Sequence, residues 1–357
     1  MTDRQNIAAW LPAVGAKLEV RPASTPEPGH DELLIRTEAI PIQPAEYKIQ
    51  DGVLPYPLTY PAIIGVSFSG TVVKIGPGVT RFQVGDRVAT NSAVVLRNDA
   101  RFGALQRYAL TTQQLTAKVL HPLPLPFYLL QIGDASFEKA ASLASGIYGA
   151  MSALILHLHL EKPSSTPNPL NKFKKILIWG AASSFGACAV QIAASAGYSV
   201  VGVASGLNAE LVKSLGASEF VDRTQSSATD TLIALGPFHA VLAAADSARD
   251  QETIGAVLAA QGGGSFLCTM GVRDGVTLPD GVSGIFAPFL EAYLDPANSE
   301  FTRWVWWEFL EQKLAENQIQ ALPTRVLGGL SHAQEAWDLL RQGKTSAERL
   351  IIQPNAE

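Results

Sequence analysis

The chain has 357 residues, of which 47% are hydrophobic and 17% charged, and its formal net charge at pH 7 is −5. This length is typical of two domains and provides enough apolar surface for folding without metals or disulfides. The mild acidity argues against sequence-independent binding of nucleic acid, which requires clustered Lys and Arg, and we expect no nucleic-acid partner.

Two features of the sequence indicate the compartment. Cys188 and Cys268 are the only cysteines, which excludes a disulfide framework and is typical of a reducing environment. Residues 1–10 hold no apolar run of signal-peptide length. The longest apolar helical stretch, 147–160, is too short to span a bilayer. We therefore expect a cytoplasmic protein with no membrane partner.

Short strands and turns fill the chain to about residue 135. Residues 70–75 (GTVVKI) and 84–89 (VGDRVA) have strand composition and are closed by glycine turns. Many short strands of this kind predict a small barrel-like β domain. The segment Leu120–Ile132 (LHPLPLPFYLLQI) is apolar, uncharged and rich in proline. It is interpreted as a surface loop on a hydrophobic patch, a lipophilic lip over a pocket, or a gene-model artefact such as a retained intron.

Strands and helices alternate after residue 140. A helix is predicted over 139–160, and a loop rich in Pro, Ser and Asn follows it to residue 172. Five predicted strands then alternate with helices, at 176–179, 198–204, 219–222, 240–244 and 264–268. This rhythm predicts an α/β fold with a doubly wound parallel sheet.

The last segment returns to the first domain. Ser331–Gln334 has the pattern of a capping box, and the helix after it places Ala333, Ala336, Trp337 and Leu340 on one face. Gly343 ends this helix, and a final strand at 350–352 is expected to join the β domain. The α/β part is then an insertion in the β domain. Trp304, Trp306 and Trp307 are interpreted as core residues or a subunit contact.

The strongest local signal for a ligand is Gly180-Ala-Ala-Ser-Ser-Phe-Gly186, which follows a buried strand and opens a helix. Small residues let the backbone approach a pyrophosphate, and a helix N-terminus offers free N–H groups and the positive end of its dipole. The spacing is G-x-x-S-x-x-G, with Ser183 in the middle, instead of G-x-G-x-x-G. With the strand–helix alternation behind it, this turn predicts a nucleotide-binding domain.

The end of the second α/β strand indicates which dinucleotide binds. NAD-specific sites place a carboxylate there to bind the ribose hydroxyls, but this strand continues as Ser205-Gly-Leu-Asn208. Ser205 and Asn208 can donate to a 2′-phosphate, and Lys213 and Arg223 are available as charges. For Lys213, a solvated position on the helix is an equally good interpretation. The pattern favours NADP(H).

The sequence offers no zinc site. Catalytic zinc in dehydrogenases needs Cys and His ligands, and no cysteine precedes residue 188. His157 and His159 are two positions apart in a predicted helix, so they point about 160° apart and cannot share a metal. We therefore expect no metal in this protein.

Several motifs together resemble those of the medium-chain dehydrogenase/reductase superfamily. Within it the chain is most similar to the zinc-free quinone-oxidoreductase-like branch, and there to fungal trans-acting enoyl reductases of the lovastatin type. The motifs are IQPAEYK at 42–48, GVSFSG at 65–70, VGDRV at 84–88, GALQRY at 103–108, the E-x-A-A-x-L run at 138–143, and Gly343-Lys344 before the strand 350–352. In this family the zinc-ligand positions correspond to Gln43 and Val66.

The resemblance implies two domains and their site residues. It implies a GroES-like β-barrel-type catalytic domain at 1–160 and 305–357, and a Rossmann NADP(H)-binding domain with a doubly wound parallel sheet at 161–304. The cofactor-binding residues it implies, joined to those derived above, are Ala45, Glu46, Tyr47, Lys48, Gly180, Ala182, Ser183, Ser184, Phe185, Ser205, Asn208, Lys213, Arg223, Thr269, Met270, Ile351 and Ile352. The implied substrate pocket is lined by Ala144, Ser145, Gly146, Ile147, Tyr148, Gly149, Ala150 and Met151.

The implied reaction is transfer of a hydride from NADPH to an activated C=C bond, as in an enoyl or enone group. Negative charge then develops on the carbonyl oxygen, and Lys48 and Tyr47 are the candidate catalytic residues that would face it. A quinone reductase and an inactive NADP(H)-binding regulator are the alternatives. Ser67, Ala144 and Arg223 replace the Asp, Pro and Tyr of the family and keep the second alternative open. The substrate is a free small molecule or a carrier-bound enoyl group presented by a polyketide synthase, and both monomer and homodimer stay open.

Overall fold

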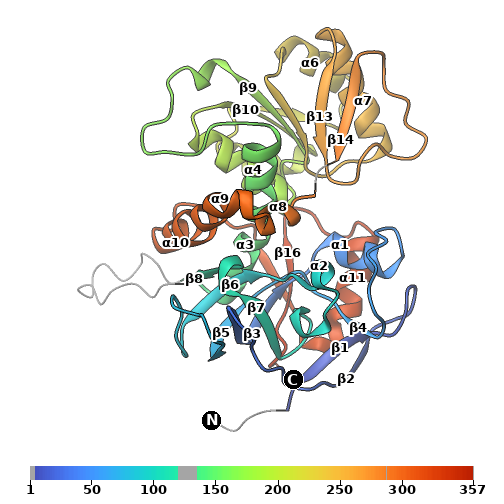
Figure 1. Cartoon of the computed structure of the whole chain (residues 1–357). Coiled ribbons are helices and arrows are strands. Elements are labelled where there is room, and N and C mark those ends of the chain that lie inside the picture. The colour runs from blue at the N-terminus through green and yellow to red at the C-terminus, as the bar shows by residue number, and fades with distance from the viewer. Residues whose placement is uncertain (1–4, 120–134, 287, 357) are drawn as a thin grey trace. The chain divides into compact units, whose positions relative to one another are not determined.

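The computed structural model describes residues 5–119, 135–286 and 288–356. The segment Leu120–Ile132 lies outside these ranges, so its three interpretations concern residues that the structure does not describe. Two compact units divide the chain (Figure 1). One comprises Met1–Ser145 with Tyr293–Glu357, and the other comprises Gly146–Ala292. The catalytic and nucleotide-binding domain boundaries derived from the sequence stay a prediction.

The first unit is built on two sheets that are mostly antiparallel. In the described residues, the smaller sheet has the order β2-β1-β4, and the larger has the order β15-β16-β3-β5-β6-β8 with β7 paired to β3. The strands are β1 (Ile7–Leu11), β2 (Glu19–Pro22), β3 (Glu32–Pro41), β4 (Ala62–Ile63), β5 (Ser67–Ile75), β6 (Arg87–Asn91), β7 (Tyr108–Thr112), β8 (Thr116–Lys118), β15 (Thr324–Gly328) and β16 (Arg349–Ile352). The predicted β domain is confirmed.

Strands β3 and β5 approach each other closely at one glycine. A Cβ atom at Gly70 would lie 2.0 Å from the carbonyl oxygen of Arg36 on β3, so no other residue fits between these backbones. The last strand, β16, then pairs with β3 in antiparallel register, with Ile351 opposite Pro41 and Ile352 opposite Ile40. The predicted return of the final strand to the β domain is therefore confirmed.

The helices of this unit come from both of its chain segments. They are α1 (Pro44–Gln50), α2 (Val94–Arg97), the start of α3 (Phe137–Met151), α8 (Glu291–Leu294), α9 (Ser299–Arg303), the π-helical turn Trp304–Phe309, α10 (Leu310–Ala315) and α11 (Ala333–Arg341). In α11, Ala333, Ala336 and Trp337 are fully buried, as the sequence predicts. The predicted capping box is wrong, because a 3₁₀ turn at Leu330–His332 makes His332 the N-cap, without a side-chain cap.

The three tryptophans pack within this unit. Trp306 is buried and meets Tyr293 edge to face, with ring centroids 6.3 Å apart. Trp307 donates from Nε1 to the carbonyl oxygen of Gln113 at 3.1 Å, and the guanidinium of Arg81 lies 5.0 Å from its ring centroid. Aromatic packing and cation–π contact therefore account for the cluster, which favours the core interpretation.

The second unit contains a parallel sheet in the order β11-β10-β9-β12-β13-β14. Its strands are β9 (Lys175–Trp179), β10 (Ser199–Ala204), β11 (Glu219–Asp222), β12 (Ala240–Ala243), β13 (Gly264–Cys268) and β14 (Val282–Phe286), and its helices after β9 are α4 (Ser184–Ser195), α5 (Ala209–Ser214), α6 (Ala228–Leu235) and α7 (Ala248–Ala260). Along the chain, β10 and β11 follow β9 on one side of it, and β12, β13 and β14 then follow on its other side. Right-handed crossovers place helices on both faces of such a sheet. The predicted fold is confirmed, and β14 is a strand that the sequence did not reveal.

The long apolar helix differs from its prediction. Regular α-helix runs over Phe137–Met151, a π-helical turn covers Ser152–His157, and His159 has a positive φ of 54°. The prediction of one helix to residue 160, with both histidines on it, is therefore wrong. Residues Phe137–His157 are long and apolar enough to cross a membrane by composition, but 78% of the apolar window is buried inside the protein. This helix is a core element.

Candidate functional site

The turn after β9 is too tight for any residue but glycine at its two ends. Gly180 has a φ of 74°, and a Cβ atom there would lie 2.7 Å from the backbone nitrogen of Ala245. A Cβ atom at Gly186 would lie 2.2 Å from the carbonyl oxygen of Gly180. The two glycines thus let helix α4 start directly against the end of β9, because no side chain separates them.

The start of α4 is a good anion site. Ser183 is the N-cap, and its hydroxyl accepts a hydrogen bond from the backbone N–H of Gly186 at 3.0 Å. The first N–H groups of a helix have no partner within the helix, and the dipole adds partial positive charge there. The turn also lies at the point where the strand order reverses, between β9 and β12, which is where α/β sheets bind ligands. These residues fit the pyrophosphate of a dinucleotide.

The end of β10 carries two of the predicted phosphate ligands. Ser205 precedes a 3₁₀ turn over Gly206–Asn208, and the Asn208 side chain donates from Nδ2 to Ser205 Oγ at 3.1 Å. Asn208 is the N-cap residue of α5 by position, but its side chain forms no cap hydrogen bond. Lys213 is exposed near the end of α5. The structure therefore brings Ser205 and Asn208 together.

A carboxylate that the sequence analysis missed stands beside this turn. A Cβ atom at Gly206 would lie 2.4 Å from Asp222 Oδ2, at the end of the neighbouring strand β11. The Asp222 carboxylate accepts bonds from the backbone N–H and the hydroxyl of Thr224 at 2.9 and 2.8 Å. These bonds hold the pKa of Asp222 below its usual value. This charge lies at the end of the strand adjacent to β10, and sequence patterns do not show which strands are neighbours.

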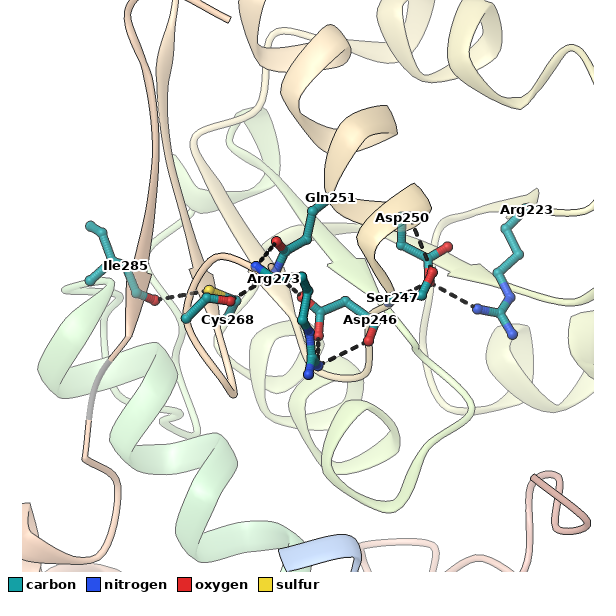
Figure 2. A network of polar contacts seen from close by, with 9 residues as sticks. Arg223, Asp246, Ser247, Asp250, Gln251, Cys268, Arg273 and Ile285 are labelled. Atoms are coloured by element: carbon teal, nitrogen blue, oxygen red, sulfur yellow. Dashed lines mark hydrogen bonds and ion pairs between the residues drawn. The ribbon is translucent and has the colours of Figure 1, made fainter. Parts of the chain in front are cut away.

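Arg223, the next residue, supplies an opposing charge. Its Nη1 donates to Asp250 Oδ2 at 3.3 Å, and 44% of its side chain is exposed (Figure 2). The same Asp250 oxygen also accepts from the backbone N–H and the hydroxyl of Ser247, both at 2.8 Å. Asp250 is thus already bonded within its own capping box, and the Arg223 guanidinium keeps donors for another anion.

The loop after β13 is held in place by hydrogen bonds with a ring of polar groups. It contains the predicted ligands Thr269 and Met270, both half-buried. Figure 2 shows Asp246, Gln251 and Arg273 joined next to it. Cys268, at the end of β13, donates to the carbonyl oxygen of Ile285 at 3.4 Å, and burial raises the pKa of its thiol to about 11. Cys268 is therefore a protonated packing residue.

In the first unit, the side chain of Glu46 on α1 is fully buried. Its carboxylate accepts from Trp337 Nε1 at 3.0 Å and from the backbone N–H groups of Gln43 and Val66, both at 3.3 Å. Burial outweighs these bonds and raises the pKa of Glu46 to about 7. Since all three donors point at the carboxylate, Glu46 links α1, α11 and the residue before β5, and its contact with the cofactor stays a prediction.

The predicted catalytic pair lies beside Glu46 on α1. Tyr47 and Lys48 are both half-buried, as is Ala45. The Arg341 guanidinium lies 5.3 Å from the centroid of the Tyr47 ring and pairs with Asp51 at 2.8 Å. Tyr47 thus has a packing role in addition to the catalytic one predicted for it.

A buried row of polar side chains includes Gln43, one of the two positions that correspond to zinc ligands in the family that the sequence resembles. Gln43 Nε2 donates to Ser67 Oγ at 2.8 Å, and the Ser67 hydroxyl donates to Asn91 Oδ1 at 2.7 Å. All three side chains are buried. Within residues 5–119, 135–286 and 288–356, no group of three or more His, Cys, Asp or Glu could hold a metal ion.

The predicted substrate segment is largely filled by the packing of its own helix. Among the described side chains of residues 144–151, Tyr148 alone is partly exposed, and the others are buried. In the second unit, a Cβ atom at Gly146 would lie 2.5 Å from Cys188 Sγ, and one at Gly149 would lie 3.5 Å from the Phe185 ring. The glycines of α3 thus serve close packing on α4, next to the nucleotide turn. Ser145 accepts a bond from Arg349, and Ile351 and Ile352 are fully buried in β16.

Comparisons with known proteins agree with this geometry. The family model described as "Alcohol dehydrogenase GroES-like domain" matches residues 29–122. The trans-enoyl reductase himH of Aspergillus japonicus is 34% identical over 358 residues, covering 99% of this chain and 98% of that protein. The dehydrogenase azaJ of Aspergillus niger is 31% identical over 362 residues, covering 97% and 98%.

A solved structure shows the same fold. The CurK enoyl reductase superposes with a TM-score of 0.74 at 20% identity, covering 98% of this chain and 99% of that one. The sequence match to himH extends over nearly the whole of both chains, so it includes both units. The chain therefore belongs to the medium-chain dehydrogenase/reductase family of oxidoreductases, among the relatives of the fungal trans-enoyl reductases.

Proposed function

We propose that this chain is an NADP(H)-dependent reductase that transfers a hydride to the activated C=C bond of an enoyl or enone group without zinc. The observation that carries the proposal is the glycine turn Gly180–Gly186, placed at the reversal of the parallel sheet. The similarity to himH, which is named a trans-enoyl reductase, supports the choice of reaction. The polar row Gln43–Ser67–Asn91 supports zinc independence, because amide and hydroxyl groups are poor zinc ligands.

The proposal assigns cofactor binding and charge stabilisation to different residues of this chain. Ala182, Ser183, Ser184 and Phe185 hold the pyrophosphate at the start of α4, and Ser205, Asn208 and Arg223 hold the 2′-phosphate. When bound, NADPH supplies the hydride. Lys48, with its ammonium, and Tyr47 stabilise negative charge on the substrate carbonyl oxygen, and solvent supplies the proton at the α-carbon. Glu46 is a positioning residue for this helix, since its carboxylate is buried.

The substrate and setting follow from the same proposal. The proposed substrate is a carrier-bound enoyl thioester presented by a polyketide synthase, and the name of himH, a trans-enoyl reductase, supports the enoyl group. Cytoplasmic location accords with two buried, free cysteines. A screen of enoyl thioesters, free enones and quinones would separate this reaction from that of a quinone reductase, which would turn over quinones alone.

The test of the cofactor is a fluorescence titration of the purified protein with NADPH and NADH in parallel. We expect preferential binding of NADPH. Ser205→Asp should weaken NADPH binding at least tenfold and change NADH binding little, because it adds a second carboxylate beside Asp222 and repels the 2′-phosphate.

The matched control is Thr231→Asp, which adds the same charge at an exposed position on α6 of the same unit. It should leave both affinities unchanged. Equal affinity of the wild-type protein for NADH and NADPH would contradict the choice of NADP(H). Binding of neither nucleotide would contradict the proposed function as a whole.

A further inference from the structure

The structure contains a ring of three polar residues after β12 and β13, in which Asp246 has a fully buried side chain, Gln251 is buried and Arg273 is partly exposed. Arg273 Nη2 donates to Asp246 Oδ1 at 2.6 Å and to the Asp246 carbonyl oxygen at 3.0 Å (Figure 2). Gln251 Nε2 donates to Asp246 Oδ2 at 2.5 Å. Gln251 Oε1 in turn accepts from the backbone N–H of Arg273 at 2.8 Å. Each member thus contacts the other two.

This ring fixes one particular loop. Gln251 Nε2 also donates to the carbonyl oxygen of Gly271 at 2.9 Å, so the loop from Thr269 to Arg273 is bonded at two backbone positions and one side chain. Gly271 has a φ of 74°, which reverses the chain within the loop. The Asp246 side chain is fully buried, and both its oxygens are used. The ring therefore joins the end of β12, the start of α7 and the loop after β13.

The position of this loop in the sheet indicates what it serves. A dinucleotide lies across the carboxyl ends of a doubly wound sheet, with one nucleotide on each half. Ser205 and Asn208 at the end of β10 are assigned to the 2′-phosphate, which belongs to the adenosine half of NADP(H). The other half then lies along the ends of β12 and β13, next to Thr269 and Met270. A loop that contacts one nucleotide needs a fixed backbone, because ordering it upon binding reduces affinity.

We propose that Asp246, Gln251 and Arg273 form a clamp that positions the loop Thr269–Arg273 for the nicotinamide half of NADP(H). The inference rests on the proposed function. The three residues act through the loop and are positioning residues. The clamp accounts for a charged pair beside the sheet that the hydride-transfer step does not use. It also predicts that the two halves of the cofactor depend on different residues.

The test compares two ligands that share the adenosine half. NADPH contains both halves, and 2′,5′-ADP contains the 2′-phosphate half without the nicotinamide. Because removing Arg273 alone leaves Asp246 charged and buried, the main variant is the neutral pair Asp246→Asn with Arg273→Gln. We expect its affinity for NADPH to fall at least tenfold, with the affinity for 2′,5′-ADP within twofold of the wild type. Arg273→Lys keeps the positive charge facing Asp246, so its affinity for NADPH should lie between that of the neutral pair and that of the wild type.

Two further measurements make the outcome decisive. Arg249→Gln, at an exposed position on α7 near Gln251, is the matched control and should change neither affinity. Thermal denaturation of each variant without ligand shows whether the fold persists. Parallel loss of both affinities, or unchanged NADPH binding, would overturn the clamp. Failure of the wild-type protein to bind either ligand would overturn the proposed function together with the clamp. If the wild type binds both ligands and the variant has the same ratio of NADPH affinity to 2′,5′-ADP affinity, the clamp alone is overturned.

Discussion

Replacing Glu46 with glutamine is expected to remove a pH dependence of folding stability on the order of 3 kcal/mol between pH 4.5 and 7. Burial raises the pKa of Glu46 from 4.5 to about 7 in the folded protein. Across this interval the folded chain keeps a proton that the unfolded chain releases. The contribution of Glu46 to the free energy of unfolding is therefore fully present below pH 4.5, decreases as the pH rises and is lost above pH 7.

Urea denaturation of the wild-type protein and Glu46→Gln at pH 5 and pH 8 would measure this effect. The difference between the two pH values should be larger for the wild type, because glutamine does not titrate. The absolute stability of Glu46→Gln should also fall, since its NH₂ group would meet one of the N–H donors of Gln43, Val66 or Trp337. Glu335→Gln, at an exposed position on α11, is the control. If the free energy of unfolding changed with pH in the same way for the wild type and Glu46→Gln, burial would not shift the pKa of this carboxyl group.

Gly186→Ala is expected to abolish nucleotide binding, with a loss of at least 100-fold in NADPH affinity and about 3 kcal/mol in stability. The added methyl group would lie 2.2 Å from the carbonyl oxygen and 2.8 Å from the carbonyl carbon of Gly180. Both atoms belong to the backbone, so rotation of a side chain cannot relieve the contact. Helix α4 must move away from β9, and the N–H groups assigned to the pyrophosphate move with it.

NADPH titration and thermal denaturation would measure both losses. The matched control is Gly29→Ala in the first unit, where the nearest atom to the added methyl group is Glu32 Oε2 at 3.3 Å. A flexible side chain can move by that amount, so this variant should bind NADPH like the wild type. If Gly186→Ala retained wild-type affinity, the turn after β9 would not be where the pyrophosphate binds.

The sequence predicted those parts of the fold that short-range patterns determine. The strand β9 is a short apolar run followed at once by small residues, and its turn and helix could be read from about ten consecutive positions. The strand β14 was missed because Val282–Phe286 contains a glycine and none of its five residues is buried. Such an edge strand has little of the apolar pattern that marks a buried one.

The remaining errors have local physical causes. The predicted helix over 139–160 rested on apolar periodicity, which does not separate α from π geometry. The N–H of Leu158 bonds to the carbonyl oxygen of Ala153, five residues earlier, which ends the helix before His159. At α11 a 3₁₀ turn moved the N-cap from Ser331 to His332.

Side-chain partners across long sequence separations were beyond the sequence patterns. Trp337 donates to Glu46 across 291 positions, and only the fold brings α1 and α11 together. The clamp residue Arg273 belongs to no motif, because its partners depend on where the loop after β13 passes. The capping box of Ser247 and Asp250 could have been found, since a serine precedes an acidic residue by three positions.

The pairing of β16 with β3 sets an order for folding during synthesis. The second unit is one continuous stretch, Gly146–Ala292, and can fold as soon as it leaves the ribosome. The end of β3 at Ile40 and Pro41 receives its partners Ile351 and Ile352 only when the last residues emerge. At translation rates of about 5–20 residues per second, this strand end waits roughly 15 to 60 seconds. Through that interval the N–H and C=O groups at this end of β3 lack the partners that β16 supplies and can pair with other chains.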